Sequence, residues 1–188
     1  MREPPLIVQA DGAVLLETQH PQYEAARARL ATFAELEKSP EYVHFYRITP
    51  ISVWNAAALG ASSHEVLDWL TENSRFPIAS EVTDRIAEWF RRYGLLRLER
   101  LNDGRMKLRS ADAELLSELA DHPSLAEIIS VERRGRVIIE AAHRGAVKQA
   151  LVRLGYPVDD RGGYQAGSNL AFELGDGVRE ARAAHRLH

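Results

Sequence analysis

The segment 49–109 constrains the fold most, because it carries the signals of three short helices followed by a β-hairpin. Thr49-Pro50 predicts a first helix over about 50–59, since threonine caps the first turn and proline is best tolerated at the first helical position. Ser62, with Glu65 three residues later, has the spacing of a capping box and predicts a second helix to about residue 73.

A third helix and a hairpin complete this segment. Apolar residues at helical spacing predict the third helix, and Gly94 marks its end. These residues are Val82, Ile86, Trp89, Phe90 and Tyr93. Residues 95–101 and 105–109 then form two strands joined by the turn residues Asn102-Asp103-Gly104. Three helices followed by a hairpin is the element order of a winged helix, which we place at about 48–110.

The second strand of this hairpin is basic. Arg105, Lys107 and Arg109 share one face, because side chains alternate along a strand. Winged helices also serve as protein-docking modules, and element order alone does not separate the two uses. The outer face of the third helix carries carboxylates as well as arginines, and carboxylates that face phosphate cost affinity. Any contact between this module and nucleic acid is therefore expected on the hairpin strand and at Arg91-Arg92, rather than at the start of the third helix.

The flanking segments predict an α+β chain with two domains. Asp11-Gly12 between two apolar runs predicts an N-terminal hairpin, and residues 1–47 are expected to pack against the winged-helix segment. Asp121-His122-Pro123 interrupts a helix, and we place the domain boundary there. The prediction is an N-terminal module over 1–120, a small ββαββ domain over 123–174 with its last strand near 170–174, and a tail over 175–188 that forms a frayed helix.

Charge is unevenly distributed, although the formal net charge is only −3. Residues 81–110 hold eight basic and five acidic side chains, and residues 130–161 hold seven and four. The intervening segment 111–129 holds five acidic and no basic side chains. Each basic block coincides with a hairpin tip. The predicted phosphate contacts are Arg133, Arg134 and Arg136 at the second hairpin, Arg144 and Lys148 on the helix after it, and Arg105, Lys107 and Arg109 on the first hairpin.

The chain offers no residue set for catalysis. It has no cysteine, its seven histidines are scattered, and no glycine-rich loop is followed by Lys-Ser or Lys-Thr. We therefore expect no metal site, no cofactor and no catalytic residue. The three tryptophans fall within amphipathic helices and are expected to pack in the core. No apolar run is long enough to span a bilayer and no signal peptide is seen, so we expect a cytoplasmic protein.

Several motifs, in their order and spacing, resemble one family. They are Arg47-Ile48-Thr49-Pro50 with Trp54-Asn55-Ala56, Ser74-Arg75-Phe76-Pro77, Lys148-Gln149-Ala150-Leu151, Gly155-Tyr156-Pro157-Val158-Asp159-Asp160 and Gly163-Tyr164. Over about residues 4–174 the chain resembles the N-terminal region of bacterial XPB/Ssl2-type DNA repair helicases.

The resemblance implies a part of a superfamily 2 translocase that moves 3′ to 5′ and uses ATP to open duplex DNA. It implies that residues after about 123 correspond to a damage-recognition domain. Earlier residues would correspond to the module that docks other TFIIH subunits in eukaryotic relatives. The phosphate-binding Gly-Lys-Thr loop and the acidic magnesium box of the motor are not found up to His188. ATP and magnesium are thus expected only for an attached motor, and the chain is either a fragment or a stand-alone relative.

The expected function is that of a non-catalytic accessory region that binds DNA and positions or regulates a helicase motor. DNA would be bound through its backbone and shape rather than its sequence. The expected partners are DNA, a linked or separate motor and a further protein partner, with no membrane. A protein-docking module is the main alternative, and a free-standing transcription regulator is a weaker one because no heptad run is present. The basic turn after residue 130 is expected to carry most of the DNA contact.

Overall fold

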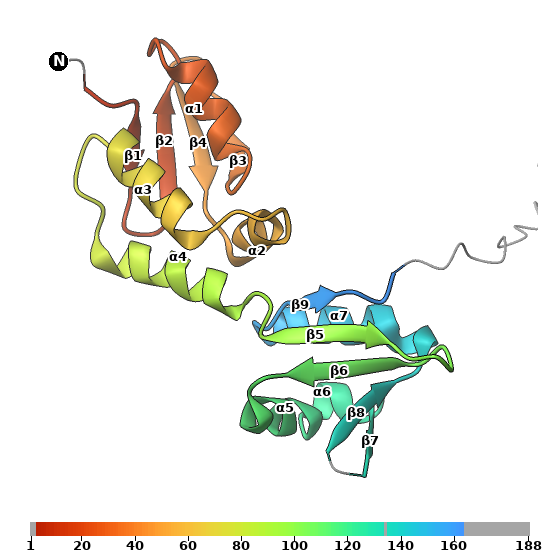
Figure 1. Cartoon of the computed structure of the whole chain (residues 1–188). Coiled ribbons are helices and arrows are strands. Elements are labelled where there is room, and N and C mark those ends of the chain that lie inside the picture. The colour runs from red at the N-terminus through yellow and green to blue at the C-terminus, as the bar shows by residue number, and fades with distance from the viewer. Residues whose placement is uncertain (1–2, 134, 164–188) are drawn as a thin grey trace, which may run out of the picture.

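A computed structural model describes residues 3–133 and 135–163, which form two lobes (Figure 1). The N-lobe, residues 3–93, contains a four-stranded antiparallel sheet in the order β1-β2-β4-β3. Its strands are β1 (Leu6–Val8), β2 (Ala13–Glu17), β3 (Glu35–Lys38) and β4 (Val43–Arg47). The β1–β2 turn contains Asp11-Gly12, so the predicted N-terminal hairpin is confirmed.

Four helices pack on this sheet and on one another, namely α1 (Tyr23–Leu30), α2 (Pro50–Ala58), α3 (Ser63–Asn73) and α4 (Ser80–Arg92). The two predicted N-caps are confirmed. The Thr49 hydroxyl accepts from the Ser52 amide at 3.1 Å, and the Ser62 hydroxyl accepts from the Glu65 amide at 3.2 Å. In each box the amide of the capping residue donates in turn to the side chain of the residue at the third helical position, so both helix starts are fixed locally.

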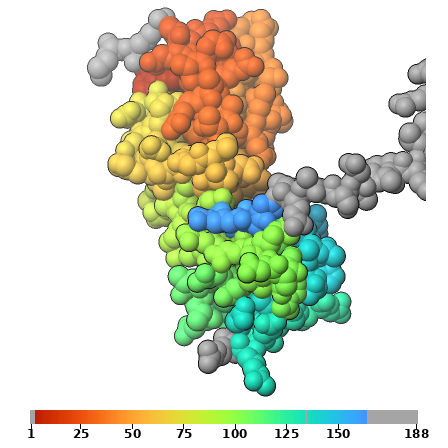
Figure 2. Space-filling view, turned by 45° about the vertical axis from the view of Figure 1, so that its right-hand side comes forward, coloured from red at the N-terminus to blue at the C-terminus, as the bar shows by residue number. Residues whose placement is uncertain are grey.

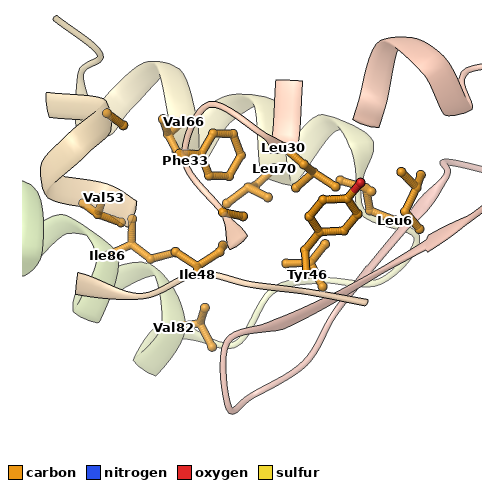
Figure 3. Close-up of a cluster of buried hydrophobic side chains, with 14 of the residues drawn as sticks. Leu6, Leu30, Phe33, Tyr46, Ile48, Val53, Val66, Leu70, Val82 and Ile86 are labelled. Carbon is orange, nitrogen blue, oxygen red and sulfur yellow. The ribbon is translucent and has the colours of Figure 1, made fainter. Parts of the chain in front are cut away.

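One apolar cluster holds the N-lobe together (Figure 3). It joins strand residues to residues from all four helices, among them Leu6, Leu16, Leu30, Phe33, Tyr46, Val53, Val66, Leu70, Val82 and Ile86. Residues 3–47 therefore pack against α2–α4, as predicted. The tryptophans also pack as predicted: Trp54 is buried, Trp69 meets Phe33 edge to face at 5.8 Å between ring centroids, and Trp89 lies against the cluster.

The hairpin after α4 does not fold back as a wing. Its strands β5 (Leu96–Arg100) and β6 (Met106–Ser110) join β7 (Ser130–Glu132), β8 (Arg136–Ile139) and β9 (Val158–Asp160) in the order β7-β8-β6-β5-β9 (Figure 1). β6 pairs antiparallel with β8, and β5 pairs parallel with β9. The winged-helix arrangement is thus replaced by a five-stranded sheet with the hairpin at its centre.

This sheet and its helices form the C-lobe, residues 94–133 and 135–163. The helices are α5 (Ala113–Ala120), α6 (Pro123–Ala126), the 3-10 turn η1 (Ala141–His143) and α7 (Arg144–Arg153). A second apolar cluster joins α5, α6 and α7 to one face of the sheet, through residues that include Leu96, Leu98, Met106, Leu108, Leu115, Leu125, Val137 and Val147.

The division between the lobes lies at about residues 93–95, not at Asp121–Pro123 as predicted. Asp121 and His122 form the short connection between α5 and α6. Both helices contribute residues to the apolar cluster of the C-lobe. The mixed α+β class is confirmed, and β7, β8, α7 and β9 match four of the five predicted elements of the ββαββ unit. The fifth, near 170–174, and the tail over 175–188 lie outside the described residues.

The two boundaries can be distinguished by truncation. A chain of residues 1–93 is expected to unfold cooperatively and to bind little of an apolar-surface dye, because its core is self-contained. A chain of residues 1–120 is expected to bind the dye strongly, since it would carry β5 and β6 without β8 and β9. Thermal unfolding by circular dichroism and dye fluorescence would measure both. A dye-silent, cooperative 1–120 chain would restore the boundary at residue 121.

Candidate nucleic-acid interface

The C-lobe sheet has one face covered by helices and one outer face. Leu98 and Leu108 are cross-strand partners and point into the apolar cluster. Because side chains alternate, Arg97 and Arg109 point away from it and are also partners. An antiparallel sheet with one solvated face commonly has this apolar-in, polar-out pattern.

Three arginines form a row across neighbouring strands of the outer face. Arg97 on β5 lies opposite Arg109 on β6. Leu108 on β6 pairs with Val137 on β8, so this register, extended by one residue, sets Arg109 opposite Arg136. The side chains of Arg97, Arg109 and Arg136 are 52%, 57% and 47% exposed. We call these three residues the arginine row.

Each arginine of the row has a carboxylate within 4 Å, but none of these ion pairs is buried. Asp159 on β9 lies 3.9 Å from Arg97, and Glu132 on β7 lies 3.9 Å from Arg136. Arg109 is bound by Glu99 at 3.2 Å. Exposed pairs of this kind contribute only about 0.2–1 kcal/mol each, and like charges directly opposite on adjacent strands destabilise a sheet. The row therefore retains guanidinium groups that can bind an anion.

The other predicted residues of the two hairpins differ in their surroundings. Arg105 is held by Asp103 at 2.8 Å and by Glu132 at 2.9 Å. Lys107 shares the outer face and forms no ion pair with any described residue. Arg133 is exposed in the β7–β8 turn, next to Arg134, which lies outside the described residues.

Arg144 and Lys148 are not part of the outer face. The Arg144 guanidinium donates to both carboxylate oxygens of Asp160, at 3.0 and 2.7 Å, and the Lys148 ammonium donates to Asp160 Oδ2 at 2.8 Å. Burial opposes ionisation of Asp160, but these hydrogen bonds and one from the Gly162 amide outweigh it and lower its pKa to about 2. These two cations therefore neutralise an internal carboxylate that lies at the end of β9.

Arg91 and Arg92, the predicted contacts on α4, are also engaged. Both donate to Glu88, each at 2.8 Å. The hydrogen bonds from Arg91 and Arg92 lower the pKa of Glu88 to about 2, so this carboxylate stays ionised and holds both arginines. The α4 arginines are thus less available to an anion than the arginine row.

Arg97 and Asp159 were not predicted from the sequence. Arg97 stands in the first strand of the hairpin with the same alternation that identified Arg105, Lys107 and Arg109, so its face could have been predicted. Asp159 could not be assigned, because its place beside Arg97 depends on the parallel pairing of β9 with β5.

The described residues contain no cluster of three His, Asp or Glu side chains suited to a metal ion. Within the same part of the chain, every helix is too short or too polar to cross a membrane.

Comparison with known proteins identifies the family. The model of the helicase conserved C-terminal domain matches residues 6–134, which include the N-lobe from β1 onward and the C-lobe as far as β7. The chain belongs to this family. Its description refers to a C-terminal domain, whereas the resemblance drawn from the motifs is to the N-terminal region of helicases, so the position within a longer protein stays a prediction.

Relatives with helicase names extend over nearly the whole chain. The chain is 39% identical over 177 residues to the DNA 3′-5′ helicase XPB of Kineococcus radiotolerans, covering 94% of this chain and 32% of that protein. It is 39% identical over 188 residues to the protein of the same name from Mycobacterium tuberculosis, covering all of this chain and 34% of the relative. A Drosophila melanogaster TFIIH helicase/translocase subunit XPB is 26% identical over 141 residues, covering 75% of this chain and 18% of that subunit.

These matches confirm the predicted resemblance to XPB-type superfamily 2 helicases. The chain spans about a third of the length of the two bacterial relatives.

The internal carboxylate Asp160 is expected to stabilise the C-lobe in a pH-dependent way. Its pKa, about 2, lies below the ordinary value of 3.8, so the stabilisation is present above about pH 4 and is lost as pH falls toward 2. Asp160→Asn is expected to lower the free energy of unfolding at pH 7 by about 2–3 kcal/mol. Urea unfolding at several pH values would measure this, and the difference from wild type should shrink in acid.

The matched control is Asp103→Asn, which changes an exposed carboxylate of the β5–β6 turn and should alter stability little. Equal effects of the two substitutions at pH 7 would contradict a structural role for the Asp160 cluster.

Proposed function

We propose that the chain is a non-catalytic accessory region of an XPB-like 3′-5′ DNA repair helicase, and that it binds DNA and positions or regulates the motor. The names of the bacterial relatives support a role on DNA, and the family match supports association with a helicase. The arginine row is the single observation that carries the proposed DNA contact.

The geometry of the row suits phosphate rather than bases. Neighbouring strands lie about 4.8 Å apart, so three arginines on adjacent strands span about 10 Å and can reach successive backbone phosphates. Lys107 lies on the same face, two residues before Arg109 in β6 and directly opposite Ile138 of β8. Guanidinium and ammonium groups bind phosphate oxygens without reading base edges, so this contact would be independent of sequence.

Arg133 and Arg136 extend the same face to the β7–β8 turn. Arg133 is exposed, and among the described residues the ion pair of Arg136 is the long contact with Glu132. We therefore keep the turn after residue 130 in the proposed interface, but as one end of the arginine row. Arg105, Arg144 and Lys148 are proposed to contribute less, because nearby carboxylates hold their charges.

Docking of a protein is the second candidate, and one observation on the N-lobe favours it. β3 is an edge strand whose four residues are all exposed, and Leu36 on it is 51% exposed. Tyr42, in the connection to β4, is 60% exposed. An exposed edge strand presents unpaired backbone groups that an extended segment of another chain can bind.

Replacing the arginine row tests the DNA contact. If each arginine contacts one phosphate, Arg97→Ala/Arg109→Ala/Arg136→Ala should lower the slope of log affinity against log salt by about 2–3 units. Fluorescence anisotropy of a labelled forked duplex over a salt series would measure the slope.

A control variant removes the same charge from the N-lobe, through Arg27→Ala/Arg29→Ala/Lys38→Ala. It should leave the slope nearly unchanged. Equal slopes for wild type and the row variant would move the contact elsewhere, and no binding by wild type at low salt would favour protein docking.

The proposal also predicts that the chain alone does not hydrolyse nucleotides, since its sequence contains no phosphate-binding loop. Purified chain with magnesium–ATP and DNA should release phosphate only at the rate of a no-protein blank. The proposal of a non-catalytic region would fail if turnover were observed and were abolished by a point substitution within this chain.

A further inference from the structure

A cleft of about 480 Å³ lies between the two lobes. One wall is the outer side of α2, with Ile51, Trp54, Asn55 and Ala58, and the other is formed by α7 and the segment that leads into β9. Figure 2 shows β9, in blue, at the boundary between the lobes. The volume is within the range of about 300–1,000 Å³ that is usual for sites that bind small ligands.

The aromatic and polar groups of the cleft are suited to a planar ligand with hydrogen-bonding edges. The indole N–H of Trp54 donates to the Trp89 carbonyl at 3.0 Å, which fixes the ring in the wall. The Asn55 amide and the Tyr93 hydroxyl also line the cleft, and neither has a hydrogen-bond partner in the described part of the chain. Aromatic rings and an amide are the groups that bind unstacked bases by stacking and by their polar edges.

The charged groups that line the cleft are Asp159, Asp160 and Lys148. Asp160 is 9% exposed and is bound by Arg144 as well as by Lys148. Lys148 is 40% exposed. Asp159 is bound by Arg161 at 2.7 Å. Both carboxylates are therefore neutralised by cations, and Lys148 can also face a phosphate at the mouth of the cleft.

The cleft is continuous with the arginine row. Asp159 lines the cleft and lies 3.9 Å from Arg97, the first member of the row. A nucleic-acid backbone held by the row would thus pass the mouth of the cleft at β9.

We propose that this cleft binds one unpaired nucleotide of the DNA held by the arginine row. Its base would lie against Tyr93 and the part of Trp54 that lines the cleft. The Asn55 amide would bind the polar edge of the base, and Lys148 would face its phosphate. The inference rests on the proposed DNA contact and adds to it a site for an extruded base. A nucleotide fits better than a protein side chain because the cleft combines aromatic, amide and ammonium groups beside a row of phosphate-binding arginines.

The test compares two duplexes that differ only in one unpaired position. Each carries a single-nucleotide bulge, which holds adenine in one and an abasic tetrahydrofuran in the other. Wild type is expected to bind the adenine bulge about tenfold more tightly than the abasic bulge, by fluorescence anisotropy at fixed salt.

Ala58→Trp fills the cleft from an exposed position of α2 and should abolish this preference while leaving affinity for a fully paired duplex unchanged. Asn55→Ala should reduce the preference. The control is Ala146→Trp, at an exposed position of α7 that does not line the cleft, and it should retain the preference.

Equal affinities of wild type for the two bulges would overturn the nucleotide site while leaving the DNA contact in place. A preference that survives in Ala58→Trp would also overturn it. If no duplex bound at low salt, both the site and the proposed function would fail.

Discussion

The central position of the β5–β6 hairpin is the constraint on which the C-lobe depends. Each strand of the hairpin has a second partner, β8 on one side and β9 on the other, so neither is an edge of the sheet. The register that buries Leu98 and Leu108 also turns Arg97 and Arg109 outward as partners. A slip of one residue would exchange the two faces. The arginine row is therefore fixed by the same pairing that forms the core.

Helices and hairpins that are marked by nearby capping and turn residues could be predicted from the sequence. The way in which they assemble could not. The capping residues Thr49 and Ser62 act within one helical turn, so the starts of α2 and α3 were correct. The hairpin itself was also correct, but its partners lie far along the chain, as the pairing of Leu96 with Val158 shows. The sequence signals were compatible with a wing packed on α4. The sheet is selected only when the apolar face of β8 and Val158 of β9 pack, in three dimensions, against the second apolar cluster.

In the candidate site, too, features that depend on one strand could be predicted, and features that depend on distant pairing could not. Alternation along one strand correctly grouped Lys107 and Arg109, because their common face depends only on the strand. Counting charge could not predict which cations remain available. Arg144 and Lys148 belong to a basic block in the sequence, yet both bind Asp160, which the parallel pairing of β9 with β5 brings beside α7. Which cations can bind an anion thus depends more on where the carboxylates lie in the folded chain than on the local excess of arginine in the sequence.

Both walls of the cleft are attached to α4, and this links the cleft to the angle between the lobes. On the N-lobe side, the hydrogen bond from Trp54 to the Trp89 carbonyl fixes α2 to α4. On the C-lobe side, the Arg92 guanidinium lies 5.3 Å from the centre of the Tyr156 ring and is held by Glu88. Gly155 permits this approach, because it has φ +83° and a Cβ there would lie 2.9 Å from Arg92 Nη1. A change in the α4 contacts is therefore expected to alter the width of the cleft without touching the arginine row. The proposed binding of the DNA backbone and the proposed binding of a base should thus respond to different substitutions.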